Sequence, residues 1–241
     1  DLEEPVYFAQ SVQRMLSPDG IWVVEMSYLP DMLAMNSFDT ICHEHLEYYS
    51  LATLEYIVKR AGMRICRVQR NSINGGSIRC WVVNGFNDLS KDEWKAEIDQ
   101  LRKSEFDLCL DTHKPYEEFH ARICKVRDQL CRFIISALKN GEEIHVYGAS
   151  TKGNTLLQWC GLDNRHITRA ADRNPDKHGA YTLGTNIMII SEEESRAMRP
   201  DWYLVLPWHF KEEILMRENE TIMNGTGMIF PLPEFKAIKV S

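Results

Sequence analysis

Residues 144–172, IHVYGASTKGNTLLQWCGLDNRHITRAAD, run through a short apolar strand, a turn of glycine and small hydroxyl residues, a helix and a second strand. The turn from Gly148 to Asn154 comes directly before the helix, where exposed backbone N–H groups bind anions. Asp172 ends the second strand, about 20 residues on, where Rossmann-like domains hold a ribose hydroxyl. The segment predicts a nucleotide-binding βαβ unit; a plain turn followed by a helix-capping aspartate is the structural alternative.

The candidate binding residues of this turn are Gly148, Ser150, Lys152 and Asn154, with Lys152 adding positive charge. The turn matches neither G-x-G-x-x-G nor G-x-x-x-x-G-K-[ST], so its specificity as a nucleotide motif is moderate. An NAD(P)-dependent oxidoreductase is therefore an alternative that the missing G-x-G-x-x-G disfavours.

Further α/β elements follow this unit. A third strand at Ile187–Ile190, a helix from Ser191 to Met198 and a fourth strand at Trp202–Leu206 predict a small, doubly wound parallel sheet over residues 141–241. His209 follows the fourth strand, where such domains offer side chains to a ligand. The alternative is structural: Pro207-Trp208-His209-Phe210 is the aromatic start of a helix.

Residues 89–140 predict a helical connector, because they are strongly charged and show helical periodicity on both sides of Pro115, with a long helix from Glu117 to Lys139. Residues 1–88 predict a separate α/β unit. Its expected elements are a helix over 2–16, a buried parallel strand at 21–24, an irregular loop over 27–50, a Ser50-capped helix over 51–61, and two strands over 63–69 and 77–83.

The long loop carries the densest polar cluster, Cys42-His43-Glu44-His45-Leu46-Glu47-Tyr48-Tyr49. Its imidazoles and carboxylates suit general acid/base chemistry, with His43, Glu44, His45 and Tyr48 as candidates. A metal site is a weaker alternative, because adjacent residues do not easily converge on one ion and no second ligand cluster completes a site. A polar loop with partly buried aromatic residues is the structural alternative.

A glycine-rich turn joins the two strands at 63–69 and 77–83. Asn74 within Asn74-Gly75-Gly76-Ser77 is a weaker binding candidate. A Gly-Gly hairpin turn explains this stretch equally well.

Composition narrows the classes of function. The 241 residues carry a formal charge of -7 without a basic cluster, which disfavours nucleic-acid binding. No apolar run approaches the roughly 20 residues of a membrane span, and no signal peptide is visible, so we expect a cytoplasmic protein without a membrane partner. Seven cysteines without a C-x-x-C pair favour reduced thiols over a disulfide frame or zinc ribbon.

Three stretches together suggest a family: FDTICHEHLEYYSLATLEYIVKRAGMRICRVQRNSINGGSIRCWVV, VYGASTKGNTLLQWCGL and LPWHF. Their combination resembles the S-adenosylmethionine-dependent C-methyltransferases that act on nucleotide-linked deoxysugars. The resemblance covers nearly the whole chain. It implies a class I methyltransferase sheet followed by a Rossmann-like domain that closes over the sugar nucleotide.

The resemblance also implies roles. His45 is the expected base, with Glu44 beside it, and forms an enolate next to a keto group of the sugar. Asn74, His209 and the Gly148–Asn154 turn are expected substrate contacts. The chain departs from the family at Cys42, where a tyrosine is common.

The chain begins at Asp1, on a helical pattern. QRMLSPDGIWVVEM is similar to a late helix and strand of a class I methyltransferase. We therefore expect a fragment that lacks the zinc-binding segment and most of the S-adenosylmethionine site. The alternative function is a sugar-nucleotide-binding module without catalysis.

Overall fold

The computed structural model describes residues 2–240, except for the side chain of Asn74. The chain forms two compact units, each described separately below. Unit 1 comprises residues up to Met35 together with His43–Phe119, and unit 2 comprises Asn36–Cys42 together with the chain from His120 onward. The long loop thus leaves unit 1 for seven residues and then returns to it.

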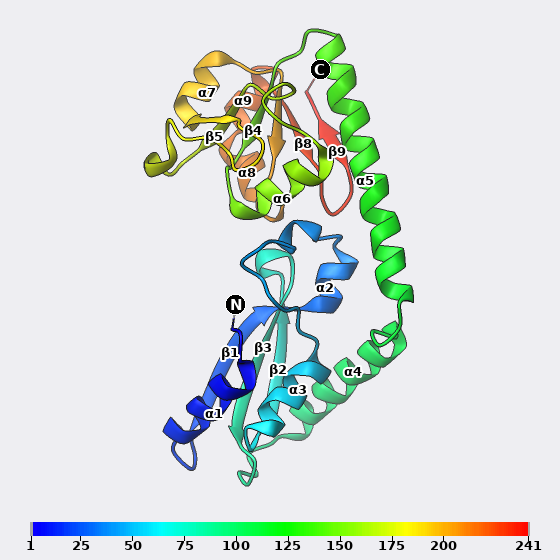
Figure 1. Ribbon diagram of the computed structural model, residues 1–241, viewed down its shortest axis with the longest axis vertical. Coiled ribbons are helices and arrows are strands. Elements are labelled where there is room, and N and C mark those ends of the chain that lie inside the picture. Colours follow the sequence, from blue (N-terminus) through cyan, green and yellow to red (C-terminus); the bar gives the residue numbers. More distant parts are fainter. Residues whose placement is uncertain (1, 241) are drawn as a thin grey trace. The chain divides into compact units, whose positions relative to one another are not determined.

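Unit 1 is a three-stranded antiparallel sheet with helices (Figure 1). The sheet has the strand order β1-β3-β2. Its elements are α1 (Pro5–Met15), β1 (Ile21–Ser27), α2 (Leu29–Ala34), α3 (Leu51–Arg60), β2 (Met63–Asn71), β3 (Ser77–Asn84) and α4 (Asp92–Leu108), and α5 (Lys114–Lys139) begins in this unit.

The direction predicted for the strand at 21–24 is wrong. β1 pairs antiparallel with β3, from Ile21 opposite Val83 to Ser27 opposite Ser77. The strand is also not fully buried, because Ile21 and Val23 are 46% and 49% exposed. An apolar β-branched run predicts a strand but carries no information on the direction of its neighbour.

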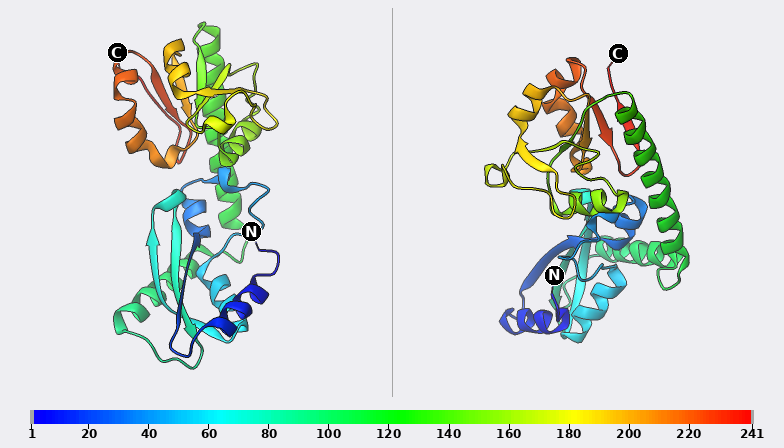
Figure 2. Two further views of the ribbon diagram at one scale, coloured as in Figure 1. Left: turned by 90° about the vertical axis from the view of Figure 1, so that its left-hand side faces the viewer. Right: turned by 45° about the horizontal axis from the view of Figure 1, so that its top comes forward.

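The apolar core of unit 1 lies on one face of this sheet, and the left view of Figure 2 shows α1 and α3 on that face. Residues such as Leu51, Leu54 and Val82 are buried there. Ser50 caps α3 as predicted, because its Oγ accepts the N–H of Thr53 at 3.2 Å. The two strands predicted on either side of the glycine-rich turn are confirmed as β2 and β3.

The loop over 27–50 is not irregular throughout, since it contains α2 and a 3₁₀ turn at Phe38–Thr40. Pro30 stands in the first turn of α2, where its missing N–H costs no hydrogen bond.

Unit 2 contains a six-stranded sheet of order β6-β5-β4-β7-β8-β9. β4 to β8 are parallel, and only β9 is antiparallel. Its elements after α5 are β4 (Ile144–Tyr147), α6 (Thr151–Cys160), β5 (Arg169–Asp172), β6 (Met188–Ser191), α7 (Glu192–Met198), β7 (Trp202–Val205), α8 (Lys211–Arg217), α9 (Asn219–Met223), β8 (Gly227–Phe230) and β9 (Lys236–Ile238). The predicted doubly wound parallel sheet is confirmed, and the structure defines the elements α8 to β9, for which no residue ranges were predicted.

The strand order of the unit 2 sheet shows where its topological switch point lies. The chain builds outward from β4 to β5 and β6, and then crosses to β7 on the other side. The carboxyl ends of β4 and β7 therefore flank the topological switch point, where ligands bind in open α/β sheets.

None of the helices in the described part of the chain is long and apolar enough to cross a membrane. The long charged helix predicted to end at Lys139 is α5.

Candidate functional site

The loop of residues 43–49 lies at the carboxyl end of β1. Tyr28 and Tyr49 form a short parallel bridge, and the N–H of Leu29 donates to the carbonyl of Tyr49 at 2.9 Å. A pocket of about 190 Å³ is formed there by Met26 to Leu29, Met32 and the loop. His45 and Tyr48, two of the four predicted catalytic residues, line this pocket.

The other two predicted catalytic residues lie elsewhere on the loop. His43 and Glu44 are exposed and do not line the pocket. The carboxylate that shares the pocket with His45 is Glu47, which accepts the phenol hydrogen of Tyr49. Burial and this neighbouring carboxylate raise the pKa of Tyr49, so its phenol stays protonated as a donor.

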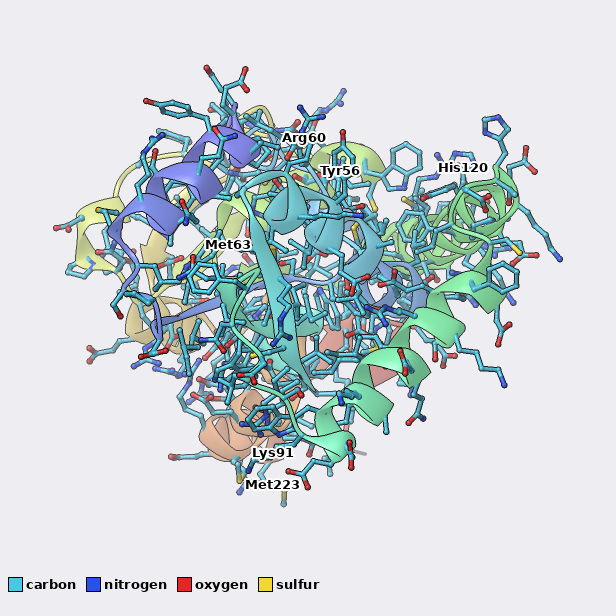
Figure 3. All side chains as sticks on the ribbon, turned by 90° about the horizontal axis from the view of Figure 1, so that it is seen from below. Tyr56, Arg60, Met63, Lys91, His120 and Met223 are labelled. Atoms are coloured by element: carbon cyan, nitrogen blue, oxygen red, sulfur yellow. The ribbon has the colours of Figure 1, made fainter. Side chains whose placement is uncertain are left out.

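A second, more open hollow of about 580 Å³ adjoins the pocket and shares Leu29, Glu47, Tyr48 and Tyr49 with it. Its other walls include Leu46, Thr53, Tyr56 and Tyr116. Tyr56 and Arg60 extend from the exposed side of α3 (Figure 3), and Arg60 Nη1 donates to the Tyr56 phenol oxygen at 3.0 Å. The loop of residues 43–49 thus lines both the small pocket and the larger, mainly apolar hollow.

A buried carboxylate on α4 holds both ends of the longer loop over 27–50, which includes residues 43–49. Glu105 accepts the phenol hydrogen of Tyr28 at 2.7 Å and the backbone N–H groups of Leu51 at 2.5 Å and Ala52 at 3.1 Å. The two N–H groups belong to the first turn of α3, where helix donors lack intrahelical partners. Glu105 therefore ties the end of β1 to the start of α3.

The glycine-rich turn between β2 and β3 has a structural explanation. Gly76 has φ +126, and a Cβ there would overlap Asp31 Cβ and lie 2.8 Å from its Cγ. Asp31 is buried and pairs with Arg70. Only glycine fits this close approach. The side chain of Asn74 lies outside the described residues, so its predicted role in binding stays a prediction.

In unit 2, the turn predicted over Gly148–Asn154 is shorter than expected, because α6 already begins at Thr151, and it has the form of an anion site. Gly148 has φ +84 and a Cβ there would lie 2.8 Å from Pro207 Cδ. Ser150 caps α6 by accepting the N–H of Gly153 at 3.1 Å. Among the described residues, no hydrogen bond uses the backbone N–H of residues 150, 151 or 152, or the ammonium of Lys152. These groups are free to meet a ligand.

Asn154 lies one position after Gly153, in the first turn of α6. Its backbone N–H donates to the carbonyl of Ser150 at 3.0 Å, and its side chain is half-buried. The residue is therefore placed near the turn, and its role in binding stays a prediction.

Asp172 ends β5 as predicted, and its carboxylate already has protein partners. Oδ2 accepts the N–H of Ala149 at 2.8 Å and the ammonium of Lys177 at 3.1 Å, and Oδ1 accepts the N–H of Asn174 at 2.9 Å. The residue thereby shapes the turn after β4. A ribose hydroxyl at Asp172 would have to share these oxygens.

His209 follows β7 at the switch point. Burial and the nearby charge of Lys152 lower the pKa of His209 to about 4, so its imidazole is neutral near pH 7. Trp208, beside it, is buried and donates its indole N–H to Asp39 Oδ2 at 2.9 Å. Asp39, Lys152 and His209 thus form a polar cluster at the ends of β4 and β7.

We expect this depressed pKa to appear in the acid stability of the chain. The unfolded state, with a histidine pKa near about 6.5, binds more protons than the folded state between pH 6.5 and 4, so stability falls as pH drops through this window. Chemical denaturation at several pH values should show a shallower slope for His209→Gln. Buried His145, whose pKa is also lowered by burial, leaves part of the slope.

Exposed His113→Gln is the matched control for this experiment and should keep the wild-type profile. A profile of His209→Gln that is parallel to that of the wild-type chain would contradict the assignment.

Comparison with known protein families matches residues 72–233 to the C-methyltransferase C-terminal domain. This chain belongs to that family. The C-methyltransferase NovU of Streptomyces niveus is a relative, 34% identical over 227 residues that make up 94% of this chain and 53% of NovU. The chain thus spans about half the length of the curated relative that it matches.

The matched residues of this C-methyltransferase domain include β3 and the whole parallel part of the sheet in unit 2. The loop of residues 43–49 precedes the family match, but it falls within the stretch aligned with NovU, which covers 94% of the chain.

Three polar residues of this C-methyltransferase domain were missed by sequence reasoning: Asp39, Glu47 and Glu105. Glu105 had a readable signal, because it follows Ile98 and Leu101 on the buried face of α4. A carboxylate in an apolar stripe predicts a buried partner. Asp39 had no such signal, because it lies in a loop without periodicity. Within the described residues, no group of three or more His, Cys, Asp or Glu side chains could hold a metal ion, and all seven cysteines are free thiols.

Proposed function

We propose that this chain is the acceptor-substrate part of an S-adenosylmethionine-dependent C-methyltransferase that acts on a ring carbon of a nucleotide-linked keto-deoxysugar. Membership of the C-methyltransferase family supports the reaction class. The observation that carries the proposal is the placement of His45 and Tyr48 in one pocket at the end of β1. An imidazole and a phenol together provide the base and the hydrogen-bond donor that enolate formation needs.

In this mechanism the imidazole of His45 removes the acidic proton from the carbon next to the keto group. The electron pair of that C–H bond moves into the enolate, whose oxygen gains negative charge. A phenol donor from Tyr48 stabilises this oxygen more strongly than the ground-state carbonyl. Glu47 keeps Tyr49 in place on the pocket wall.

The pocket that holds His45 and Tyr48 is too small for S-adenosylmethionine. The pocket of about 190 Å³ is smaller than the roughly 300–1,000 Å³ that hold drug-sized ligands. The sequence offers no acidic glycine-rich loop for the donor either. We therefore assign the methyl donor, and the zinc of the resembling enzymes, to residues outside this chain.

Unit 2 is assigned the nucleotide part of the substrate. The diphosphate meets the unused N–H groups at the start of α6 and the ammonium of Lys152. Asn154 in the first turn and His209 at the end of β7 are assigned as further contacts. His209, being neutral near pH 7, acts as a hydrogen-bonding group here and not as a second cation.

The misfit of the methyl donor favours one alternative, a sugar-nucleotide-binding module without catalysis. The two proposals share the ligand of unit 2 and differ in the base of unit 1. An assay of proton removal, described in the Discussion, distinguishes them.

Calorimetric titration of the 241-residue chain tests the shared part. We expect binding of a nucleoside diphosphate keto-sugar and no saturable binding of S-adenosylmethionine. Lys152→Ala should weaken sugar-nucleotide binding by about tenfold or more, because it removes a charge-assisted contact. Lys125→Ala, an exposed lysine of α5, should change nothing. Failure of the wild-type chain to bind any nucleoside diphosphate sugar would refute the proposed function.

A further inference from the structure

The seven residues that the long loop contributes to unit 2 are firmly held there. Asn36 adopts φ 53, accepts from Arg122 Nε at 2.8 Å through its Oδ1 and donates to the carbonyl of Pro233 at 2.9 Å. Phe38 is 3% exposed and contacts the ring of Trp159 on α6 with a centroid distance of 6.2 Å. The segment therefore packs in a fixed position against α6.

Asp39 is the charged residue at the centre of this segment, and it is 2% exposed. Its Oδ2 accepts the indole N–H of Trp208, whereas its Oδ1 is buried without a hydrogen-bond partner among the described residues. Burial raises the pKa of the Asp39 carboxyl, and the Trp208 indole, the Lys152 charge and the backbone N–H groups of Asp39 and Thr40 counteract that rise. The Oγ of Ser37 is likewise buried without a partner there.

A buried polar atom without a partner is rare in native proteins and is energetically unfavourable, more so when it is charged. The fold therefore keeps an unfavourable arrangement at Asp39. An ionised carboxylate can only accept hydrogen bonds, so a ligand that relieves this cost must bring an O–H or N–H donor.

The neighbours of Asp39 define the rest of the ligand. The positive charge of Lys152 interacts electrostatically with both Asp39 and His209. The Lys152 ammonium has no hydrogen bond or ion pair with another described residue. The unused N–H groups at the start of α6 add to this positive potential. The hydrogen-bond acceptor Asp39 therefore lies beside the anion-binding groups of Lys152 and the start of α6. A ligand that fits both carries a hydrogen-bond donor close to a negative charge.

We propose that Asp39 is a substrate-binding residue whose Oδ1 accepts a hydrogen bond from a hydroxyl of the sugar nucleotide, while Lys152 and the start of α6 hold its diphosphate. This inference rests on the function proposed above. A sugar nucleotide carries hydroxyls on both the ribose and the sugar, within a few bonds of the diphosphate.

The arrangement also gives selectivity. The negative charge of Asp39 repels an anion bound at Lys152, and a hydroxyl donor compensates for that repulsion. Asp39 therefore disfavours free diphosphate and favours the complete sugar nucleotide.

The experiment titrates the wild-type chain and Asp39→Asn with inorganic pyrophosphate, a nucleoside diphosphate and a nucleoside diphosphate keto-sugar. The asparagine keeps an acceptor for Trp208 and loses the charge. We expect the variant to bind the sugar nucleotide about 10- to 100-fold more weakly, as for a lost hydrogen bond to a charged group, and to bind pyrophosphate at least as tightly as the wild-type chain. A loss that appears already with the nucleoside diphosphate assigns the ribose hydroxyl, and a loss only with the complete ligand assigns the sugar.

Equal affinities of variant and wild type for the sugar nucleotide, or an equal loss for all three ligands, would overturn the inference and leave the proposed function intact. Absence of sugar-nucleotide binding by the wild-type chain would overturn both. Thermal melting checks folding, Asp39→Ser is the second variant if the asparagine variant is unfolded, and exposed Asp176→Asn is the control.

Discussion

Replacing His45 by asparagine should lower the rate of proton removal from the keto-sugar by a factor of about 10² to 10⁴, the usual contribution of a general base. The chain, a nucleotide-linked keto-deoxysugar and deuterium oxide suffice for this assay, because exchange of the acidic proton for deuterium needs the base and not the methyl donor. Magnetic resonance or mass spectrometry follows the exchange. In the full-length protein, the same variant should lose methyl transfer to a similar degree.

His43→Asn is the matched control, since His43 lies two residues away on the same loop, is exposed and does not line the pocket. It should retain exchange near the wild-type rate. Tyr48→Phe, at a pocket residue, should slow exchange without abolishing it. Exchange by His45→Asn at the wild-type rate would remove His45 as the base, and a wild-type chain that binds the sugar nucleotide without exchange would favour the binding module.

The elements that were predicted correctly have local causes. Ser50 and Ser191 each precede a helix and accept a backbone N–H three residues on, so their capping role depends only on neighbouring residues. The parallel strands of unit 2 are short buried apolar runs between helices, which the alternation of patterns reveals.

The elements that were missed depend on contacts distant in sequence. β1 is antiparallel because β3, more than 50 residues later, pairs with it, and the apolar run 21–24 is compatible with either direction. Asp39 becomes a buried acceptor only because Trp208 reaches it from 169 positions away. The sequence identified the loop of residues 43–49 as a candidate site, but which of its histidines lines a pocket depends on the path of that loop over β1.

The largest loss of stability is expected at Glu105. Glu105→Ala leaves the Tyr28 phenol and the N–H groups of Leu51 and Ala52 without their acceptor in a buried place. Each unpaired donor costs about 1–3 kcal/mol, and partial relaxation of the structure and entry of water reduce the total cost of the three donors. We therefore expect the free energy of unfolding to fall by about 3–5 kcal/mol. Urea denaturation followed by circular dichroism measures the change.

Two further variants on α4 serve as controls for the loss of stability in Glu105→Ala. Exposed Glu97→Ala should change the free energy of unfolding by less than about 0.5 kcal/mol. Glu105→Gln keeps one carbonyl acceptor and should lose less than Glu105→Ala, because an amide oxygen can still accept from the start of α3. Since Glu105 ties the end of β1 to the start of α3, its glutamine variant should also slow proton exchange. The affinity of the chain for the sugar nucleotide, which is assigned to unit 2, should stay unchanged. A Glu105→Ala chain as stable as the Glu97→Ala chain would show that the carboxylate is not what fixes the ends of the loop.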